Sequence, residues 1–385
     1  MSRIKVSVVT GTRADYGLLF WLLKEIELDK DIQLQLIVTG MHLSNEFGLT
    51  YREIEKNFKI DKKVEMLLTS DGELDISKSM GLAQISFSKV YSELLPDLLI
   101  VLGDRYEIFS AATAAMISRI PIAHISGGES TEGVIDEAIR HSLTKMSHLH
   151  FVSTEEYKKR VIQLGEQPNR VFNVGALAID NYKKLDLVSK DELENLIKFK
   201  FNKRNILVTF HPVTLEKSTA EIQFQELLNS IDKLKDTNII FTKSNSDQGG
   251  RIINKMIDKF VSLRVNCISF DSMGQVRYLS ALREVDAVIG NSSSGLMEAP
   301  SFGIGTINIG DRQKGRINLE SIINCDPLEK SINDAFHILY SDKFQNKLKN
   351  IQNPYGDGDA SGKIKKIIKN FDFANILKKS FYDLK

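Results

Sequence analysis

Short apolar runs alternate with amphipathic stretches along almost the whole chain. The runs are apolar on both faces, which is typical of parallel strands buried in a sheet, and the stretches between them have helical periodicity. In the first half, the expected strands are residues 4–10, 33–39, 98–102, 120–125 and 149–153. The expected helices there are residues 18–27, 45–57, 77–94, 107–118 and 136–146. Strands separated by helices predict βαβ units and a parallel sheet.

The pattern restarts after a polar, lysine-rich stretch at residues 186–204, which includes an expected helix at 190–199. The expected strands of this half are residues 205–210, 238–242, 265–270, 287–289 and 305–309. The expected helices are residues 219–234, 250–263, 273–282, 295–302 and, as a closing helix, 363–379. We therefore predict an α/β protein of two Rossmann-type, doubly wound parallel-sheet domains, with the divisions 1–185, 186–360 and a C-terminal helix at 361–385.

Size and charge narrow the class of protein. The chain has 385 residues, which suits about two domains, and its 51 Lys and Arg balance 50 Asp and Glu. This balance argues against nucleic acid or an anionic membrane as a partner. No apolar run approaches the roughly 20 residues that a membrane span needs, and no signal segment precedes the first strand. Cys267 and Cys325 lack the spacing of a metal site or disulfide framework, so we expect a cytoplasmic protein without bound metal.

The most informative segment is Gly-Asn-Ser-Ser-Ser-Gly-Leu-Met-Glu at residues 290–298, between an apolar run and a short helical stretch. Glycine and small hydroxyl residues leave backbone N–H groups uncovered at the positive end of a helix, where a phosphate binds. Glu298 follows about one turn later, where it would take the two hydroxyls of a ribose. The alternative is an ordinary strand–helix turn with a serine N-cap.

Two doubly wound domains usually hold their ligand at the C-terminal ends of their strands, in the interdomain cleft. In the first half, Asp104 and Arg105 follow one strand, and Glu129 and Asp136 follow the next. Three carboxylates on one sheet edge would raise one another's pKa, as a proton-abstracting site requires, and Arg140 would balance their charge. The alternatives are N-cap duty for Asp104 and solvated surface groups.

Other polar residues also follow strands. Arg13 lies in a glycine-containing turn without a GxGxxG fingerprint, where it can reach a phosphate or remain a solvated surface residue. His211, held by a proline, is a phosphate ligand, a proton carrier or a packing histidine. Arg312 lies in a glycine-bounded cationic loop that either clamps a diphosphate or is solvated. This pattern predicts nucleotide binding by the second half and acid/base chemistry by the first.

Eight motifs, in this order, resemble the hydrolysing UDP-N-acetylglucosamine 2-epimerases of bacterial sialic acid synthesis. They are GTRADY (11–16), TGMH (39–42), GDR (103–105), GGE (127–129), IRHS (139–142), HPVT (211–214), GNSS (290–293) and GDRQ (310–313). The resemblance implies a GT-B-like fold whose C-terminal helix packs back on the first domain. It also implies a homodimer or homotetramer that needs no cofactor or metal and that serves sialic acid and capsule polysaccharide synthesis.

The implied reaction starts when UDP-GlcNAc loses its C2 proton and then UDP, leaving a glucal-like intermediate. Water adds with inversion at C2 and gives free N-acetylmannosamine. The resemblance implies catalytic roles for Asp104, Glu129, Asp136 and His211. It implies nucleotide or substrate contacts at Arg13, Ala14, His42, Arg105, Lys243, Asn245, Asp247, Ser292, Ser293, Glu298 and Arg312, although His42 also suits a structural role.

One departure from the family pattern leaves the substrate open. Many members have a glutamate where this chain has Ser126, so either Glu129 or Asp136 takes its role or the sugar differs. Residues 65–70 and 77–83 also resemble enzymes of legionaminic acid synthesis, which act on a UDP- or GDP-linked 2,4-diacetamido-2,4,6-trideoxyhexose. A GT-B glycosyltransferase and a non-catalytic nucleotide-sugar sensor are further alternatives.

Overall fold

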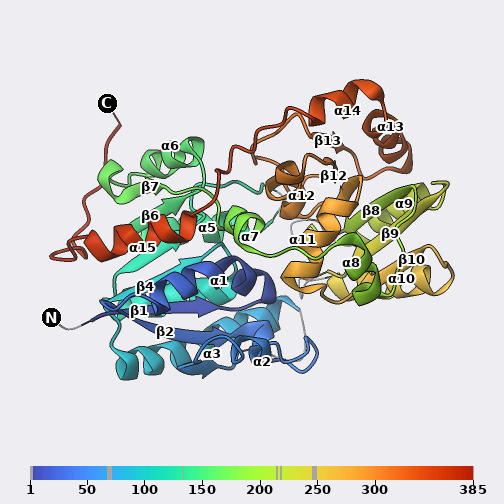
Figure 1. Cartoon of the computed structure of the whole chain (residues 1–385). Coiled ribbons are helices and arrows are strands. Elements are labelled where there is room, and N and C mark those ends of the chain that lie inside the picture. The colour runs from blue at the N-terminus through green and yellow to red at the C-terminus, as the bar shows by residue number, and fades with distance from the viewer. Residues whose placement is uncertain are drawn as a thin grey trace. The chain divides into compact units, whose positions relative to one another are not determined.

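The computed structural model describes residues 3–66, 72–132, 134–213, 216, 219–244 and 249–384 (Figure 1). The chain forms two compact units. The first unit comprises Met1–Glu129, Asp136–Asn181 and Tyr355–Lys385, and the second unit comprises Ser130–Ile135 and Tyr182–Pro354. This division differs from the expected one in three places. The chain leaves the first unit after residue 181 rather than 185, returns at 355 rather than 361, and contributes residues 130–135 to the second unit.

The first unit contains a seven-stranded parallel sheet in the order β3-β2-β1-β4-β5-β6-β7. Its strands are β1 (Ile4–Thr10), β2 (Ile32–Thr39), β3 (Lys62–Val64), β4 (Leu98–Leu102), β5 (Ile122–Ile125), β6 (Leu149–Val152) and β7 (Val171–Asn173). Its helices include α1 (Arg13–Glu27), η1 (Gly40–Leu43), α2 (Tyr51–Ile54), α3 (Glu73–Leu94), α4 (Tyr106–Ile117), α5 (Asp136–Met146), α6 (Glu155–Gln163), η2 (Pro168–Arg170), α7 (Leu177–Lys184, at the boundary) and α15 (Ala360–Asn370).

Apolar side chains cover both faces of this sheet. Val8 of β1 packs with Leu22 of α1 and Ile364 of α15 on one face, and Val9 packs with residues of α3 and α4 on the other. Neighbouring strand residues point to opposite faces, so continuous apolar strands need helices on both sides. This explains why β4 is apolar at every position. In β1, the polar Ser7 is also buried, and its hydroxyl donates to Gln35 Oε1 (2.8 Å).

The second unit contains a six-stranded parallel sheet in the order β10-β9-β8-β11-β12-β13. Its strands are β8 (Arg204–Thr209), β9 (Thr237–Thr242), β10 (Cys267–Phe270), β11 (Ala287–Gly290), β12 (Gly305–Ile309) and β13 (Ile322–Cys325). Its helices include α8 (Lys190–Ile197), α9 (Ala220–Ile231), α10 (Gly250–Ser262), α11 (Gly274–Glu284), α12 (Ser293–Met297), η3 (Ala299–Phe302), α13 (Glu329–Leu339) and α14 (Asp342–Leu348).

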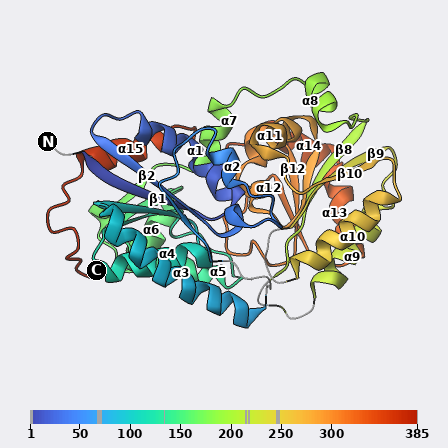
Figure 2. The same ribbon diagram turned by 90° about the horizontal axis from the view of Figure 1, so that it is seen from below.

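Helices also cover both faces of the second sheet (Figure 2). Val208 of β8 packs with residues of α9, α10 and α13, whereas its neighbour Leu207 packs with residues of α8 and α11. Two doubly wound parallel sheets confirm the expected α/β architecture of two Rossmann-type domains.

The expected closing helix at residues 363–379 is wrong in its second half, because α15 ends at Asn370. The tail beyond it is held by contacts with the first unit. The Lys379 ammonium donates to the backbone carbonyls of Lys145 (2.6 Å) and Ser147 (2.8 Å) and pairs with the fully buried carboxylate of Glu166 (2.9 Å). These tertiary contacts override the local helical preference of the tail.

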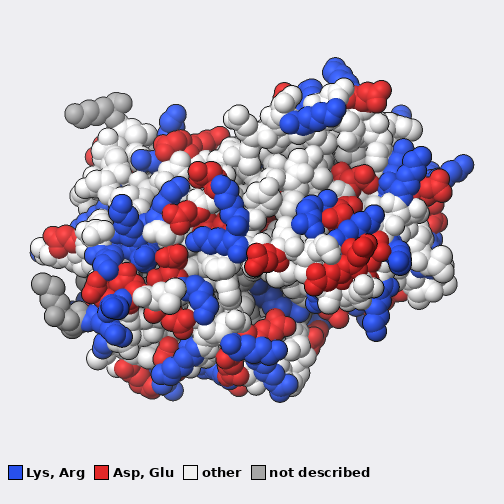
Figure 3. All heavy atoms as spheres, viewed as in Figure 1, with Lys and Arg blue, Asp and Glu red and all other residues white. Residues whose placement is uncertain are grey.

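The described part of the chain includes no helix that is both long and apolar enough to cross a membrane. On the face shown in Figure 3, positive and negative side chains are interspersed. This surface agrees with the balanced charge of the sequence.

Candidate active site

One buried arginine contacts the segments that carry the predicted acidic residues of the first unit. Arg140 of α5 is 1% exposed and pairs with the carboxylate of Asp104, which follows β4. Its Nη1 atom donates to Glu137 Oε2 (2.7 Å) and to the backbone carbonyl of Glu129 (3.1 Å), beyond β5. Asp136 begins α5 one turn before Arg140. The structure thus brings together the three segments that carry the predicted carboxylates.

A neutral histidine fixes the turn before Asp104. The Nε2 atom of His124 donates to the carbonyl of Gly103 (2.8 Å), because a carbonyl oxygen can only accept. Its Nδ1 atom therefore accepts from Thr144 Oγ1 (3.2 Å), and burial lowers the pKa of His124 to about 4. This bridge from β5 and α5 to β4 holds the backbone from which the Asp104 side chain projects.

The Gly-Gly-Glu turn places Glu129 in a buried position. Glu129 is 2% exposed, and Ser153 Oγ donates to its Oε1 atom (3.4 Å). Gly128 has a φ of +79°, and a Cβ atom there would lie 2.4 Å from the carbonyl oxygen of Tyr157. Ser126, the position where many family members carry glutamate, has a left-handed φ of +68°. The turn is therefore set by close packing as well as by sequence.

Two further acidic residues, Glu107 and Asp15, lie in the first unit and were not predicted as site residues. Glu107, in the first turn of α4, is fully buried and accepts from Arg105 Nε (3.2 Å), so the Arg105 guanidinium is part of an ion pair. Burial raises the pKa of Asp15 to about 6, although the nearby Arg105 lowers it. Asp15 lies inside the GTRADY motif and Glu107 lies two residues after Arg105, so the motifs themselves carried the signal.

Three other predicted residues of the first unit have different surroundings. The His42 ring is fully buried and bonds the hydroxyls of Thr50 (Nδ1, 2.7 Å) and Thr10 (Nε2, 3.1 Å). With both nitrogens engaged and its pKa lowered to about 4 by burial, it holds the turn after β2, and we leave it out of the proposed site. Arg13 and Ala14 open helix α1, where Ala14 is exposed and Arg13 is partly exposed.

In the second unit, one buried amide joins three strand ends. Asn291 is fully buried; its side chain accepts from His211 N (2.7 Å) and donates to His211 O (2.7 Å). Its backbone carbonyl accepts from Arg312 Nη1 (3.1 Å) and Gln313 Nε2 (2.9 Å). The ends of β8 and β11 and the loop after β12 therefore form one network. The sequence predicts site roles for His211 and Arg312 but none for Asn291, which lies inside the GNSS motif.

The backbone of the glycine–serine turn after β11 packs closely against β8. Gly290 has a φ of +128° and pairs with Thr209 of β8, whose carbonyl oxygen would lie 2.0 Å from a Cβ atom at this position. Ser292 is the N-cap of α12 and Ser293 is its first residue. Because α12 has only five residues, it contributes few aligned peptide dipoles.

Lys243, another predicted nucleotide contact, follows β9 directly. The Lys243 ammonium pairs with Asp258 (2.9 Å) and Asp271 (3.0 Å). The neighbouring Ser244 Oγ bonds His211 Nδ1 (3.1 Å), which extends the network of Asn291 to β9. Asn245 and Asp247 lie outside the described residues.

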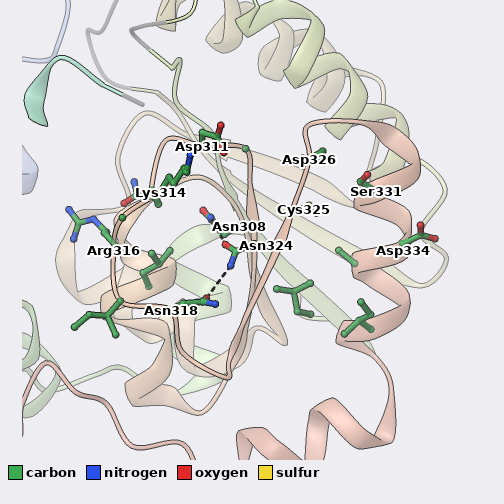
Figure 4. A pocket seen from close by; sticks show the side chains of 18 residues that line it. Asn308, Asp311, Lys314, Arg316, Asn318, Asn324, Cys325, Asp326, Ser331 and Asp334 are labelled. Carbon is green, nitrogen blue, oxygen red and sulfur yellow. Dashed lines mark hydrogen bonds between the residues drawn. The ribbon is translucent and has the colours of Figure 1, made fainter. Parts of the chain in front are cut away.

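The loop after β12 borders a pocket of about 540 Å³ (Figure 4). Side chains of β12, β13 and α13 also line the pocket, among them Asn308, Asn324 and Asp334. Asn308 Nδ2 donates to Asn324 Oδ1 (2.8 Å), and Asn324 Nδ2 donates to Asn318 Oδ1 (3.0 Å). Part of this loop therefore borders the pocket and is not packed against core residues on that side.

Glu298 gives the folded protein a pH-dependent stability. Burial raises its pKa from 4.5 to about 7. We therefore expect the protein to be most stable below about pH 4.5, to lose stability as the pH rises from there to about 7, and to change little above that. We expect Glu298→Gln to remove this fall, so that the variant gains about 1–3 kcal/mol relative to the wild type between pH 5 and 8. Chemical denaturation at both pH values measures the gain. Glu320→Gln, at an exposed carboxylate, is the control. If the unfolding free energies of Glu298→Gln and the wild type differ by the same amount at about pH 5 and about pH 8, the expectation is contradicted.

The comparisons with known proteins point to one family. Residues 24–369 match the UDP-N-acetylglucosamine 2-epimerase family. The chain is 46% identical to the GDP/UDP-N,N'-diacetylbacillosamine 2-epimerase (hydrolyzing) of Campylobacter jejuni, over 100% of both chains. It is 43% identical to a polysialic acid biosynthesis protein of Escherichia coli, over 99% of this chain and 97% of that protein. A solved UDP-GlcNAc 2-epimerase of Neisseria meningitidis, bound to UDP-GlcNAc, has the same fold, with a TM-score of 0.81 at 20% identity over 95% of this chain and 100% of that one. The chain therefore belongs to the UDP-N-acetylglucosamine 2-epimerase family.

Proposed function

We propose that this protein is a hydrolysing 2-epimerase of a nucleotide-linked 2,4-diacetamido-2,4,6-trideoxyhexose. One observation carries the choice of sugar: full-length 46% identity to the Campylobacter enzyme named for such substrates. UDP-GlcNAc, the substrate that the motifs favoured, becomes the second candidate. Its support is the 32% identity to a UDP-GlcNAc 2-epimerase of Neisseria meningitidis over 86% of each chain.

The first unit supplies the acid/base chemistry in this proposal. One carboxylate among Asp104, Glu129 and Asp136 takes the C2 proton of the sugar. The electrons of that C–H bond form a C1=C2 double bond while the C1–O bond breaks, and the diphosphate leaves with its electron pair. Water then adds its hydroxyl to C1, and a second group delivers a proton to the opposite face of C2, which inverts that centre.

The second unit holds the leaving group in this proposal. The turn at Ser292 and Ser293, with His211 and Arg312, binds the diphosphate, and Glu298 takes the ribose hydroxyls. The support is the shared network around Asn291, which joins His211 and Arg312 to the turn. Cationic and N–H donors that stabilise the departing diphosphate lower the barrier to C1–O cleavage.

Turnover of three sugar nucleotides tests the proposal. The purified protein is incubated, without an acceptor, with UDP-linked and GDP-linked 2,4-diacetamido-2,4,6-trideoxyglucose and with UDP-GlcNAc. We expect release of nucleoside diphosphate and a free C2-inverted sugar, with kcat/KM at least about tenfold higher for a diacetamido substrate, as a site that hydrogen-bonds the extra amide would give. Higher kcat/KM for UDP-GlcNAc would favour the second candidate. Release that needs an acceptor would indicate a glycosyltransferase, and binding without release would indicate a sensor.

A further inference from the structure

The chain between two of the proposed acid/base residues belongs to the second unit. Ser130–Ile135 is part of the second unit, whereas its neighbours in sequence, Glu129 and Asp136, are part of the first. Glu132 N donates to the carbonyl of Lys314 (3.0 Å), and the Lys314 ammonium lies 3.4 Å from Glu132 Oε2. Ser130 is only 8% exposed. The segment is therefore fastened to the loop that follows β12.

Gly315 makes this contact possible. It has a φ of +91°, a conformation that residues with a Cβ atom rarely adopt. A Cβ atom there would lie 2.5 Å from Ser130 Oγ and 2.8 Å from Ser130 Cβ. The loop backbone and the segment thus touch directly at Gly315, and any larger residue would push them apart.

The same loop also reaches the predicted phosphate seat. Three residues before Gly315, Arg312 donates to the carbonyl of Asn291, and Gln313 does so as well. Asn291 immediately precedes Ser292 of the anion turn. Because part of the loop borders a pocket, as Figure 4 shows, its course depends strongly on its contacts with Asn291 and with residues 130–135.

We propose that Gly315 is a positioning residue for the acid/base chemistry, an inference that rests on the proposed function. The loop after β12 contacts Asn291 through Arg312 and contacts, at Gly315, the segment that Glu129 and Asp136 flank. It thereby fixes the chain segment to which both carboxylates are covalently joined. Gly315 itself touches no substrate in this proposal.

Replacing Gly315 with alanine tests the inference. We expect Gly315→Ala to lower kcat at least tenfold while the dissociation constant for UDP changes less than threefold, because the anion turn keeps its own contacts. Ser130→Gly in the same chain removes the atoms that would clash with the new Cβ and should restore at least a third of the wild-type kcat. A general loss of folding would move both constants and would not be rescued.

The control variant is Gly303→Ala. Gly303 has a φ of +66° in the same unit, but a Cβ atom there meets only the carbonyl oxygen of Leu348, at 3.7 Å. It therefore reproduces the backbone strain without the clash, and its kcat should stay within twofold of wild type. The inference is overturned if Gly315→Ala keeps wild-type kcat, if Gly303→Ala loses as much, or if Ser130→Gly fails to restore turnover.

Hydrogen exchange separates this inference from the proposed function. In wild-type protein without nucleotide, the Glu132 amide should exchange more slowly than in Gly315→Ala, because its bond to Lys314 is then intact. Equal exchange rates would overturn the inference whatever the substrate. A wild-type protein that releases nucleotide from none of the three sugars would refute the proposed function, and the exchange comparison would still decide whether Gly315 holds the segment.

Discussion

Replacing Asp104 with asparagine is expected to lower kcat by about 10²–10⁴-fold while UDP binds as in the wild type. Asparagine has the same shape, and its side-chain oxygen can still accept from Arg140, so the turn after β4 should stay in place. The change removes the negative charge and the ability to take a proton. Single-turnover rates and titration calorimetry with UDP measure the two quantities separately.

The same strand offers a matched control. Asp97 precedes β4 at the opposite edge of the sheet, is exposed, and accepts from Lys5 N (2.8 Å). Asp97→Asn should turn over at the wild-type rate. It is the same substitution, but Asp97 lies at the N-terminal end of β4, whereas the predicted ligand site lies at the C-terminal end. Asp104→Asn with kcat within threefold of wild type would refute an acid/base or charge role for Asp104.

Replacing Arg140 with methionine is expected to destabilise the protein by about 3–5 kcal/mol and to abolish turnover. The Arg140 side chain is buried, pairs with Asp104 and Glu137 and donates to the carbonyl of Glu129. Its loss therefore leaves these acceptors without their shared cation. The side chains of Asp104 and Glu137 are only 24% and 26% exposed, and partly buried carboxylates that lose their cation cost more than an exposed pair gains. Chemical denaturation followed by circular dichroism gives the change in unfolding free energy.

Lys63→Met controls for the loss of a cation in the same unit. Lys63 pairs with Glu55 at 2.7 Å, but both side chains are largely exposed, and we expect a cost below about 1 kcal/mol. Equal costs for the two variants would contradict the structural role of Arg140.

Much of the fold could be predicted because its main strands are buried on both faces. The bounds of β1, β4 and β12 match the predicted ranges. Of the three, β4 is a continuous apolar run, as expected of a strand buried on both faces. The strands β3, β7 and β13 were missed because each has only three or four residues, and β3 begins with two lysines. The expected helix at 45–57 is wrong over most of its length: only Tyr51–Ile54 is helical. Gly48 and Leu49 have positive φ values, and local turns occupy the rest of the range.

The candidate site was predictable to the level of strand ends and no further. Parallel-sheet geometry alone places Asp104 and Glu129 at one edge, and His211 and Ser292 at another. It does not show which groups are paired. Arg105 pairs with Glu107 two residues away and His42 bonds Thr50 eight residues away, and neither pairing follows from strand position. The hydrogen bonds of Asn291 with His211 join segments 80 residues apart. The same is true of Gly315 against Ser130, which no local pattern indicates.

The fate of the sugar's C2 proton tests the central claim most directly. The wild-type protein is incubated in D₂O with UDP-linked 2,4-diacetamido-2,4,6-trideoxyglucose, and the products are examined by NMR. The account predicts one nucleoside diphosphate for each free sugar, with C2 inverted and carrying deuterium. Free sugar that keeps its original proton and configuration at C2 would show direct hydrolysis and would contradict the account.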